Sequence, residues 1–162
     1  MALEQGAPAL RAFSPGYRDI SGISPEELAK LERRRAELQR GISSERKVAR
    51  VLSGLSVDGK KVVHEVYLNE HGSEEDLKEH DVTIETDIGT IWGQVKSSDI
   101  GIRSFKSEVA KRIQRLGMSV TVNEYLALNG LVVLNGQKSI ESIQRSFLLQ
   151  KAAINQIRQS AA

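Results

Sequence analysis

The sequence predicts an α/β domain in which helices flank a central sheet. Apolar and polar residues alternate over residues 82–85 and roughly over 91–96, the period-two pattern of half-buried strands. Apolar residues recur at three- and four-residue spacing in three other segments, about 42–55, 105–116 and 140–157, as on buried helix faces. Residues 131–134, Leu-Val-Val-Leu between two Asn-Gly pairs, add a short buried strand.

Length and composition exclude several classes of protein. A chain of 162 residues with 40% hydrophobic residues can form one domain with a core. No run of 18 apolar residues predicts a membrane span, and the N-terminus has an acid where a signal peptide needs basic residues. The chain has no cysteine, which excludes disulfides and thiolate zinc sites. We therefore expect an intracellular, cytoplasmic protein.

The N-terminal third is predicted to be an arm followed by two helices. Residues 1–22 contain Gly, Pro and Ser with little periodicity, which is typical of a flexible arm. Ser24 can cap a helix that begins at Pro25, and Glu27 completes a capping box. This helix should run to about Arg40 and break or kink at Gly41, before a second helix over about 43–55. Residues 23–162 are expected to form a single domain with its core at about 41–135.

A β-hairpin is predicted over about residues 80–97, after a first strand at 60–68 and a polar loop at 69–79. A two-residue turn at Asp87-Ile88 would place Asp81 opposite Gln94, and a turn one residue later would place it opposite Lys96. Both registers put these three side chains on one face. The other face would be core and carries Val82, Ile84, Ile91 and Val95. The alternative is a plain amphipathic hairpin with a polar outer face.

Two helices are predicted in the C-terminal part. The first contains the stripe at 105–116 and ends at Gly117; residues 120–129 after it fit either a strand or a short helix. The second covers about 139–158. Its apolar stripe could form the seam of a homodimer with Gln150 as a polar register residue, or could pack on the domain's own sheet. The stripe consists of Ile140, Ile143, Phe147, Ile154 and Ile157.

The net charge of +2 conceals strong segregation of charge. Residues 30–50 and 103–115 are mainly basic, whereas residues 65–87 are mainly acidic. This order suits a metal site between two phosphate-binding surfaces, although solvated helix faces would look the same. The candidate contacts to nucleic acid are Arg46, Lys47, Arg103, Lys106, Lys111 and Arg115.

The element order and its polar residues together resemble the PD-(D/E)xK nuclease superfamily. The resemblance covers roughly residues 41–135 and implies a restriction-endonuclease-like αβββαβ core with a mixed central sheet. Within it, Gly41–Arg46, a glycine followed after three residues by Glu-Arg, is similar to the opening helix of archaeal Holliday junction resolvases. Gly72-Ser73 is similar to the Gly/Ser loop before the family aspartate.

The resemblance implies a site for Mg²⁺ or Mn²⁺. Asp81 takes the place of the central metal-binding aspartate, Lys96 that of the lysine, and Glu45 that of the acid on the first helix. Gln94 stands where the family has Asp or Glu, so the implied ligands are Asp81, the amide oxygen of Gln94, the carbonyl of Val95, and Glu45. An amide brings no charge, and Mg²⁺ prefers carboxylates and waters. The change predicts weaker metal affinity and gives Glu45 more importance.

The expected function is that of a metal-dependent endonuclease acting on DNA in repair, recombination or restriction. The alternative is an inactive nuclease-like module for nucleic-acid binding or assembly. The sequence is equally compatible with an RNA substrate, because the same phosphate chemistry serves both polymers. The scattered His64, His71 and His80 are expected to be structural or on the surface, and Trp92 to pack in the core rather than stack on a base.

Overall fold

The computed structural model describes residues 22–69 and 80–162. Nearly all of the predicted arm lies outside these residues, as do Gly72-Ser73 and most of the polar loop. The chain divides into two compact units, residues 1–37 and 38–162. Across the described residues, no helix combines the length and apolar composition needed to cross a membrane.

Helix α1 spans Pro25–Leu52, and its first turn has the predicted capping box. The Ser24 hydroxyl accepts a hydrogen bond from the Glu27 amide at 3.2 Å, and the Glu27 carboxylate accepts one from the Ser24 amide at 3.2 Å. The predicted break at Gly41 is wrong, because the helix continues through it. A helical glycine costs only about 1 kcal/mol, and three buried apolar residues in the turns that follow (Val48, Val51 and Leu52) offset that cost.

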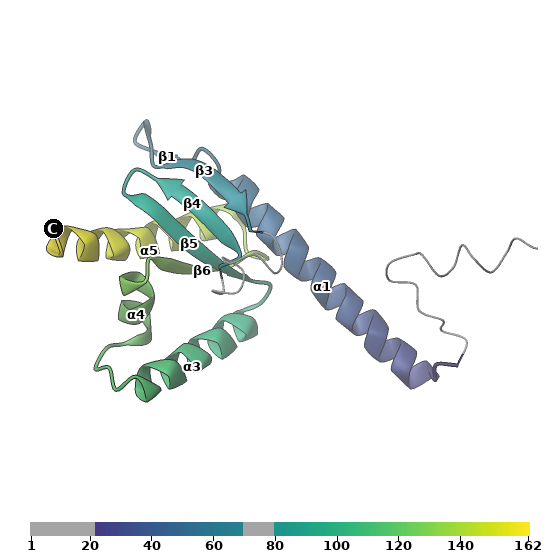
Figure 1. Cartoon of the computed structure of the whole chain (residues 1–162). Coiled ribbons are helices and arrows are strands. Elements are labelled where there is room, and N and C mark those ends of the chain that lie inside the picture. The colour runs from purple at the N-terminus through teal and green to yellow at the C-terminus, as the bar shows by residue number, and fades with distance from the viewer. Residues whose placement is uncertain (1–21, 70–79) are drawn as a thin grey trace, which may run out of the picture. The chain divides into compact units, whose positions relative to one another are not determined.

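The main sheet has four strands in the order β3-β4-β5-β6. They span Val63–Leu68, Val82–Thr86, Gly89–Lys96 and Leu131–Asn135. The first three are antiparallel neighbours, whereas β6 pairs parallel to β5. The chain crosses from β5 to β6 through helices α3 (Asp99–Arg115) and α4 (Val122–Leu128), which lie together in Figure 1. The α/β class and the mixed sheet are therefore confirmed.

A small second hairpin precedes this sheet and was not predicted. Strands β1 (Ser56–Val57) and β2 (Lys60–Lys61) pair around Asp58-Gly59. Both turn residues have positive φ, 51° and 76°, as a tight primed turn requires. The Asp-Gly pair is the local signal for this turn. Because Lys60–Lys61 pair in the small hairpin, the strand predicted over 60–68 begins only at Val63.

The core lies on both faces of the main sheet. One cluster packs α1 and α5 (Ile140–Ser160) against the sheet, and in it the predicted core residues Val82, Ile84, Ile91 and Val95 are all buried. The other cluster packs α3 and α4 against the opposite face. It contains Val109, Ile113, Leu126, Leu131 and Val133, with Trp92 and Phe105 packed against it. Trp92 is thus a packing residue, as expected.

Local signals fix the ends of the helices in the crossover. Helix α3 ends at Arg115, and Gly117 has φ +65°, so the predicted helix stop is confirmed. The ambiguous segment at 120–129 contains helix α4. Thr121 caps it, accepting a hydrogen bond from the Glu124 amide at 3.1 Å, while the Glu124 carboxylate accepts one from the Thr121 amide at 2.8 Å.

Most of the apolar stripe of α5 packs on the domain's own sheet, the second of the two predicted alternatives, whereas Ile140 at the start of the helix is 56% exposed. Ile143, Phe147 and Ile154 are fully or almost fully buried there. Gln150 interrupts the stripe because its amide binds the outer edge of β6. Its oxygen accepts from the Val133 amide at 2.8 Å and its nitrogen donates to the Val133 carbonyl at 2.9 Å. The side chain thus occupies the place of a further strand and blunts the edge.

We expect Gln150→Leu to lower the free energy of unfolding by about 2 to 3 kcal/mol. The substitution keeps an apolar stem but leaves the N–H and C=O of the buried Val133 without partners. Urea unfolding measures the effect. Gln156→Leu, at an exposed position of the same helix, serves as the control and should change stability by less than about 0.5 kcal/mol. Equal effects of the two substitutions would contradict the role of Gln150.

Helix α5 also holds the turn between β4 and β5. The Lys151 ammonium lies 2.7 Å from the Asp87 carboxylate, and the two side chains are 11% and 23% exposed. The Arg158 guanidinium donates to the carbonyls of Ile88 at 2.8 Å and Thr90 at 2.6 Å. The hydrogen bond from Lys151 holds the pKa of Asp87 below its ordinary value, and burial opposes the shift.

This ion pair makes stability depend on pH in the acid range. A carboxyl group whose pKa is lower in the folded state contributes stability that is complete above its unfolded-state pKa of about 3.9. That contribution is lost as the pH falls through the folded-state pKa. We expect Asp87→Asn to flatten the decline in unfolding free energy from about pH 5 to below pH 3, measured by denaturant titration. Glu141→Gln, at an exposed position of α5, should leave the slope nearly unchanged.

Candidate functional site

The register of the β4–β5 hairpin is the first of the two predicted ones. Val82 pairs with Gly93 and Thr86 with Gly89, which leaves Asp87-Ile88 as a two-residue turn. The Thr86 hydroxyl accepts from the Ile88 amide and donates to the Gly89 carbonyl, closing the turn. The paired register ends at Val82, which pairs with Gly93. The Asp81 amide donates to the carbonyl of the same Gly93 at 2.8 Å. Asp81 therefore lies beside Gly93–Val95 of β5, and the predicted direct pairing of Asp81 with Gln94 is not formed.

The Asp81 carboxylate lies at the end of the sheet, beside the backbone of β5. Its Oδ2 accepts a hydrogen bond from the Val95 amide at 2.7 Å. Strand β4 begins only at Val82, so the carboxylate takes the place of a strand carbonyl. The N–H and C=O of a strand residue point to the same neighbour. The Val95 carbonyl therefore faces the side on which Asp81 lies, and two of the implied metal ligands share one end of the sheet.

Gln94 is buried with an unsatisfied oxygen. Its side chain is only 6% exposed and lies on the sheet face that α3 and α4 cover. Its Oε1 has no hydrogen-bond partner. A buried acceptor without a partner costs about 1 to 3 kcal/mol, and such atoms are rare in folded proteins. An amide oxygen is also a ligand that Mg²⁺ accepts, so the orphaned atom fits the metal site that the resemblance implies.

Lys96 follows two residues later on the same face of β5. Its Nζ lies 5.2 Å from the centre of the Phe105 ring on α3, within the range of a cation–π contact. The first turn of α3 comes close to its stem, since a Cβ on Gly101 would lie 3.4 Å from the Lys96 Cβ. Lys96 is half-buried, and both contacts restrict where its ammonium can lie.

Helix α1 reaches the same end of the sheet through Ser44, the neighbour of Glu45. Ser44 is fully buried, and a Cβ added to Gly136 would lie 2.5 Å from its Cβ. Gln137 donates to the Ser44 hydroxyl at 2.8 Å, and the Gly136 amide donates to the Lys96 carbonyl at 2.9 Å. The turn of α1 that carries Glu45 therefore adjoins the end of β5, and Glu45 itself is half-buried.

Sequence reasoning missed the residues after β6 that join these elements. Gly136 is the second residue of the Asn-Gly pair that follows the strand predicted at 131–134. Asp99, in the first turn of α3, accepts from the Asn135 amide at 2.9 Å and pairs with Lys138 at 3.0 Å. These hydrogen bonds, first that of Asn135 and then that of Lys138, hold the pKa of Asp99 below its ordinary value. The interactions tie α3 to the end of β6.

The site contains few charged metal ligands. Within residues 22–69 and 80–162, no three His, Cys, Asp or Glu side chains gather where they could hold one ion. A bound cation would therefore depend on the neutral oxygens of Gln94 and Val95 in addition to Asp81. His80, next to Asp81, stacks on Trp92 with ring centres 5.3 Å apart and an angle of 21° between the rings. It lies with Trp92 because β4 has not yet begun at residue 80.

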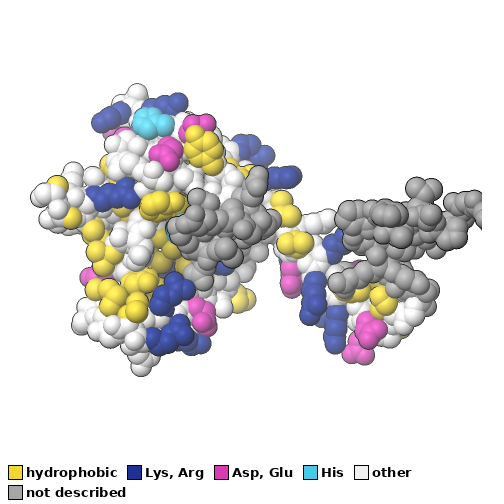
Figure 2. Space-filling view, viewed as in Figure 1, with side chains coloured by type: hydrophobic (Ala, Val, Ile, Leu, Met, Phe, Trp, Pro, Cys, Tyr) yellow, Lys and Arg dark blue, Asp and Glu magenta, His cyan; other side chains and the backbone are white. Residues whose placement is uncertain are grey.

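The six basic residues predicted to contact nucleic acid have different surroundings. Arg46 lines a shallow hollow on α1, and Lys47 donates to the Lys138 carbonyl. On α3, Lys111 pairs with Glu108 at 3.0 Å, whereas Lys106 bonds Asn123 at 3.3 Å. Arg103 and Arg115 are exposed. Figure 2 shows Lys and Arg side chains gathered over α3, in the lower part of the view.

The chain matches no family model, no curated protein sequence and no solved structure.

We expect Gln94→Met to stabilise the metal-free protein by about 1 kcal/mol. The substitution keeps the length of the side chain and removes the unsatisfied buried oxygen. In the presence of millimolar Mn²⁺ the order should reverse, because only the wild type gains stability from binding the ion. Thermal unfolding with and without Mn²⁺ measures both effects. A loss of stability on Gln94→Met without metal would show that Oε1 is satisfied in solution.

Proposed function

We propose that the protein is a metal-dependent endonuclease that hydrolyses phosphodiester bonds in DNA, in repair, recombination or restriction. The proposal places it with the PD-(D/E)xK enzymes and takes Mg²⁺ or Mn²⁺ as the cofactor. One observation carries it: the Asp81 carboxylate accepts from the Val95 amide at the end of the sheet, and the adjacent residue Gln94 has a buried oxygen without a partner. An unsatisfied acceptor beside a carboxylate is what a cation site without its ion should contain.

The order of elements supports the same assignment. Helix α1, strands β3 to β5, helix α3 and strand β6 follow one another along the chain, with α4 added before β6. The sheet is antiparallel over its first three strands and parallel between the last two. This is the succession expected of the restriction-endonuclease-like core.

The chemistry divides between the ion and the side chains. When bound, Mg²⁺ or Mn²⁺ would supply an activated water and neutralise charge on the phosphate. Asp81, the Gln94 amide oxygen and the Val95 carbonyl would hold it, and Glu45 would reach it through a water. Lys96 would orient the attacking water or donate to a phosphate oxygen as negative charge develops there. Its confinement by Phe105 and Gly101 limits the reorientation that this step requires.

The DNA strand would be held by exposed arginines of α1 and α3, the two helices that adjoin this end of the sheet. Arg46 lies on α1 and Arg103 and Arg115 on α3, and all three are exposed. A guanidinium group can bind two phosphate oxygens at once, and it keeps its charge at any physiological pH. Binding through them would weaken steeply as salt rises.

A second candidate function is an inactive nuclease-like module that binds nucleic acid. The hydrogen bond from the Val95 amide to the Asp81 carboxylate favours it, because that bond gives Asp81 a structural task without any metal. Such a module would bind DNA equally well with and without Mg²⁺.

Asp81→Asn and Lys96→Met should each reduce Mg²⁺- or Mn²⁺-dependent cleavage at least 100-fold and leave DNA binding within about threefold. The first substitution removes the negative charge of Asp81, which directly precedes β4, and the second removes the ammonium that assists the phosphate step. Cleavage is measured on four-way junctions, flaps, single strands, plasmid duplex and RNA. Gln94→Glu should preserve or raise activity, because it restores a charged ligand.

Glu85→Gln provides the matched control on β4. The Glu85 carboxylate accepts from the Thr90 hydroxyl at 3.0 Å, away from Asp81. Its substitution should leave cleavage within about twofold. Robust cleavage by both Asp81→Asn and Lys96→Met would refute the endonuclease proposal. Metal-independent binding with no cleavage of any substrate would favour the inactive module.

A further inference from the structure

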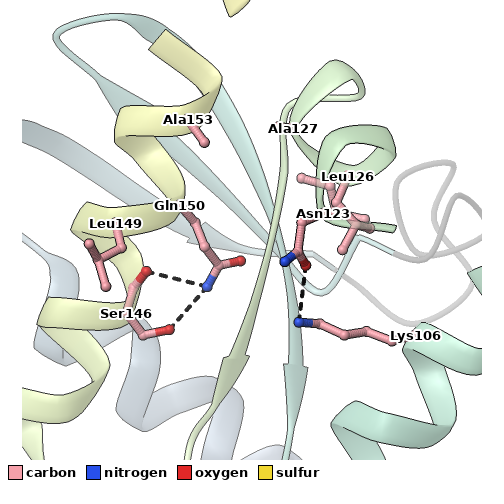
Figure 3. A pocket seen from close by; sticks show the side chains of 9 residues that line it. Lys106, Asn123, Leu126, Ala127, Ser146, Leu149, Gln150 and Ala153 are labelled. Carbon is pink, nitrogen blue, oxygen red and sulfur yellow. Dashed lines mark hydrogen bonds between the residues drawn. The ribbon is translucent and has the colours of Figure 1, made fainter. Parts of the chain in front are cut away.

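A separate hollow of 310 Å³ lies between α4 and α5, against the edge of β6. Figure 3 shows Ser146, Leu149 and Gln150 of α5 on one side and Asn123 and Leu126 of α4 on the other. Its volume is at the lower end of the range of about 300 to 1,000 Å³ that is typical of small-molecule sites. None of Asp81, Gln94, Lys96 and Glu45 lines it.

The wall of the hollow on the α5 side is fixed. The Gln150 amide makes its hydrogen bonds to Val133, and its nitrogen also donates to the Ser146 hydroxyl at 3.0 Å. These bonds hold α5 against β6 and leave the Gln150 amide occupied. The remaining contacts offered to a ligand are largely aliphatic and come from Leu126, Ala127, Leu131, Leu149 and Ala153.

Lys106 gives the hollow a positive charge. It reaches from α3 to the Asn123 side-chain oxygen at 3.3 Å, as the dashed line in Figure 3 marks. This partner is neutral, and none of the described residues that line the hollow carries a negative charge. Lys111 on the same helix has its charge paired with Glu108. A half-buried ammonium whose partner among the described residues is neutral, beside aliphatic walls, attracts an anionic group attached to an apolar body.

We propose that this hollow binds a small anion with an aliphatic body, of the alkyl carboxylate class. The carboxylate forms an ion pair with the Lys106 ammonium and accepts hydrogen bonds from the side chains around it. The alkyl chain lies against Leu126, Leu131 and Ala153 and excludes water from them. Leu149, which is 68% exposed, closes over the chain at the rim. The site is distinct from the proposed endonuclease site and does not depend on it.

The test is titration of the whole protein with straight-chain carboxylates from butanoate to decanoate, followed by calorimetry and by amide chemical shifts. Each added methylene should tighten binding about fourfold until the chain fills the hollow. Beyond that length the affinity should stop rising. Octylammonium and octanol should bind at least tenfold more weakly than octanoate, because neither has a negative charge for Lys106.

Two substitutions separate the site from general adsorption. Lys106→Met should weaken octanoate binding at least tenfold, whereas Lys111→Met should leave it within twofold. Ala153→Phe fills the hollow from an exposed helix position and should abolish binding without loss of stability. The proposal is overturned if octanoate does not bind, or if Lys106→Met and Lys111→Met have equal effects. It is also overturned if Lys106→Met weakens only DNA binding, since Lys106 then belongs to a nucleic-acid surface.

Discussion

The pairing of β4 with β5 around the two-residue turn Asp87-Ile88 is the constraint on which the rest of the site depends. A shift of one residue would move every side chain of one strand to the other face. The observed register needs glycine at position 93, where a Cβ would lie 2.5 Å from a methyl group of Val82. It also sets Asp81 at the end of the sheet, where its carboxylate accepts from the Val95 amide.

Helix α5, in the C-terminal part of the chain, stabilises this hairpin. Arg158 and Lys151 bind the turn, while Gln150 binds the free edge of β6. One helix therefore holds both the turn that sets the register and the strand that lies beside β5. The interactions are polar and directional, so they specify a geometry that apolar packing alone would leave less defined.

Among the described residues, the end of the sheet near Asp81 departs from full hydrogen-bond satisfaction. Gln94 keeps a buried oxygen without a partner, and Lys96 is restricted by an aromatic ring and by a helix turn. Proteins place such departures from local satisfaction mostly at functional sites. Helix α1 and the residues after β6 meet there through the close approach of Ser44 and Gly136, which brings distant parts of the chain to one place.

The sequence by itself determined the class of the domain, the core face of the hairpin and several helix ends, because these follow from local periodicity and capping. Ser24, Gly117 and Val82 are examples. The tertiary structure decided what depends on distant contacts. Gly41 stays helical because the turns beyond it are buried, and the Gln150 side chain binds the edge of β6. Lys106 faces a hollow because α4 and α5 meet beside it. These three outcomes could not be predicted from the type and spacing of side chains, because each arises only when separate elements pack together.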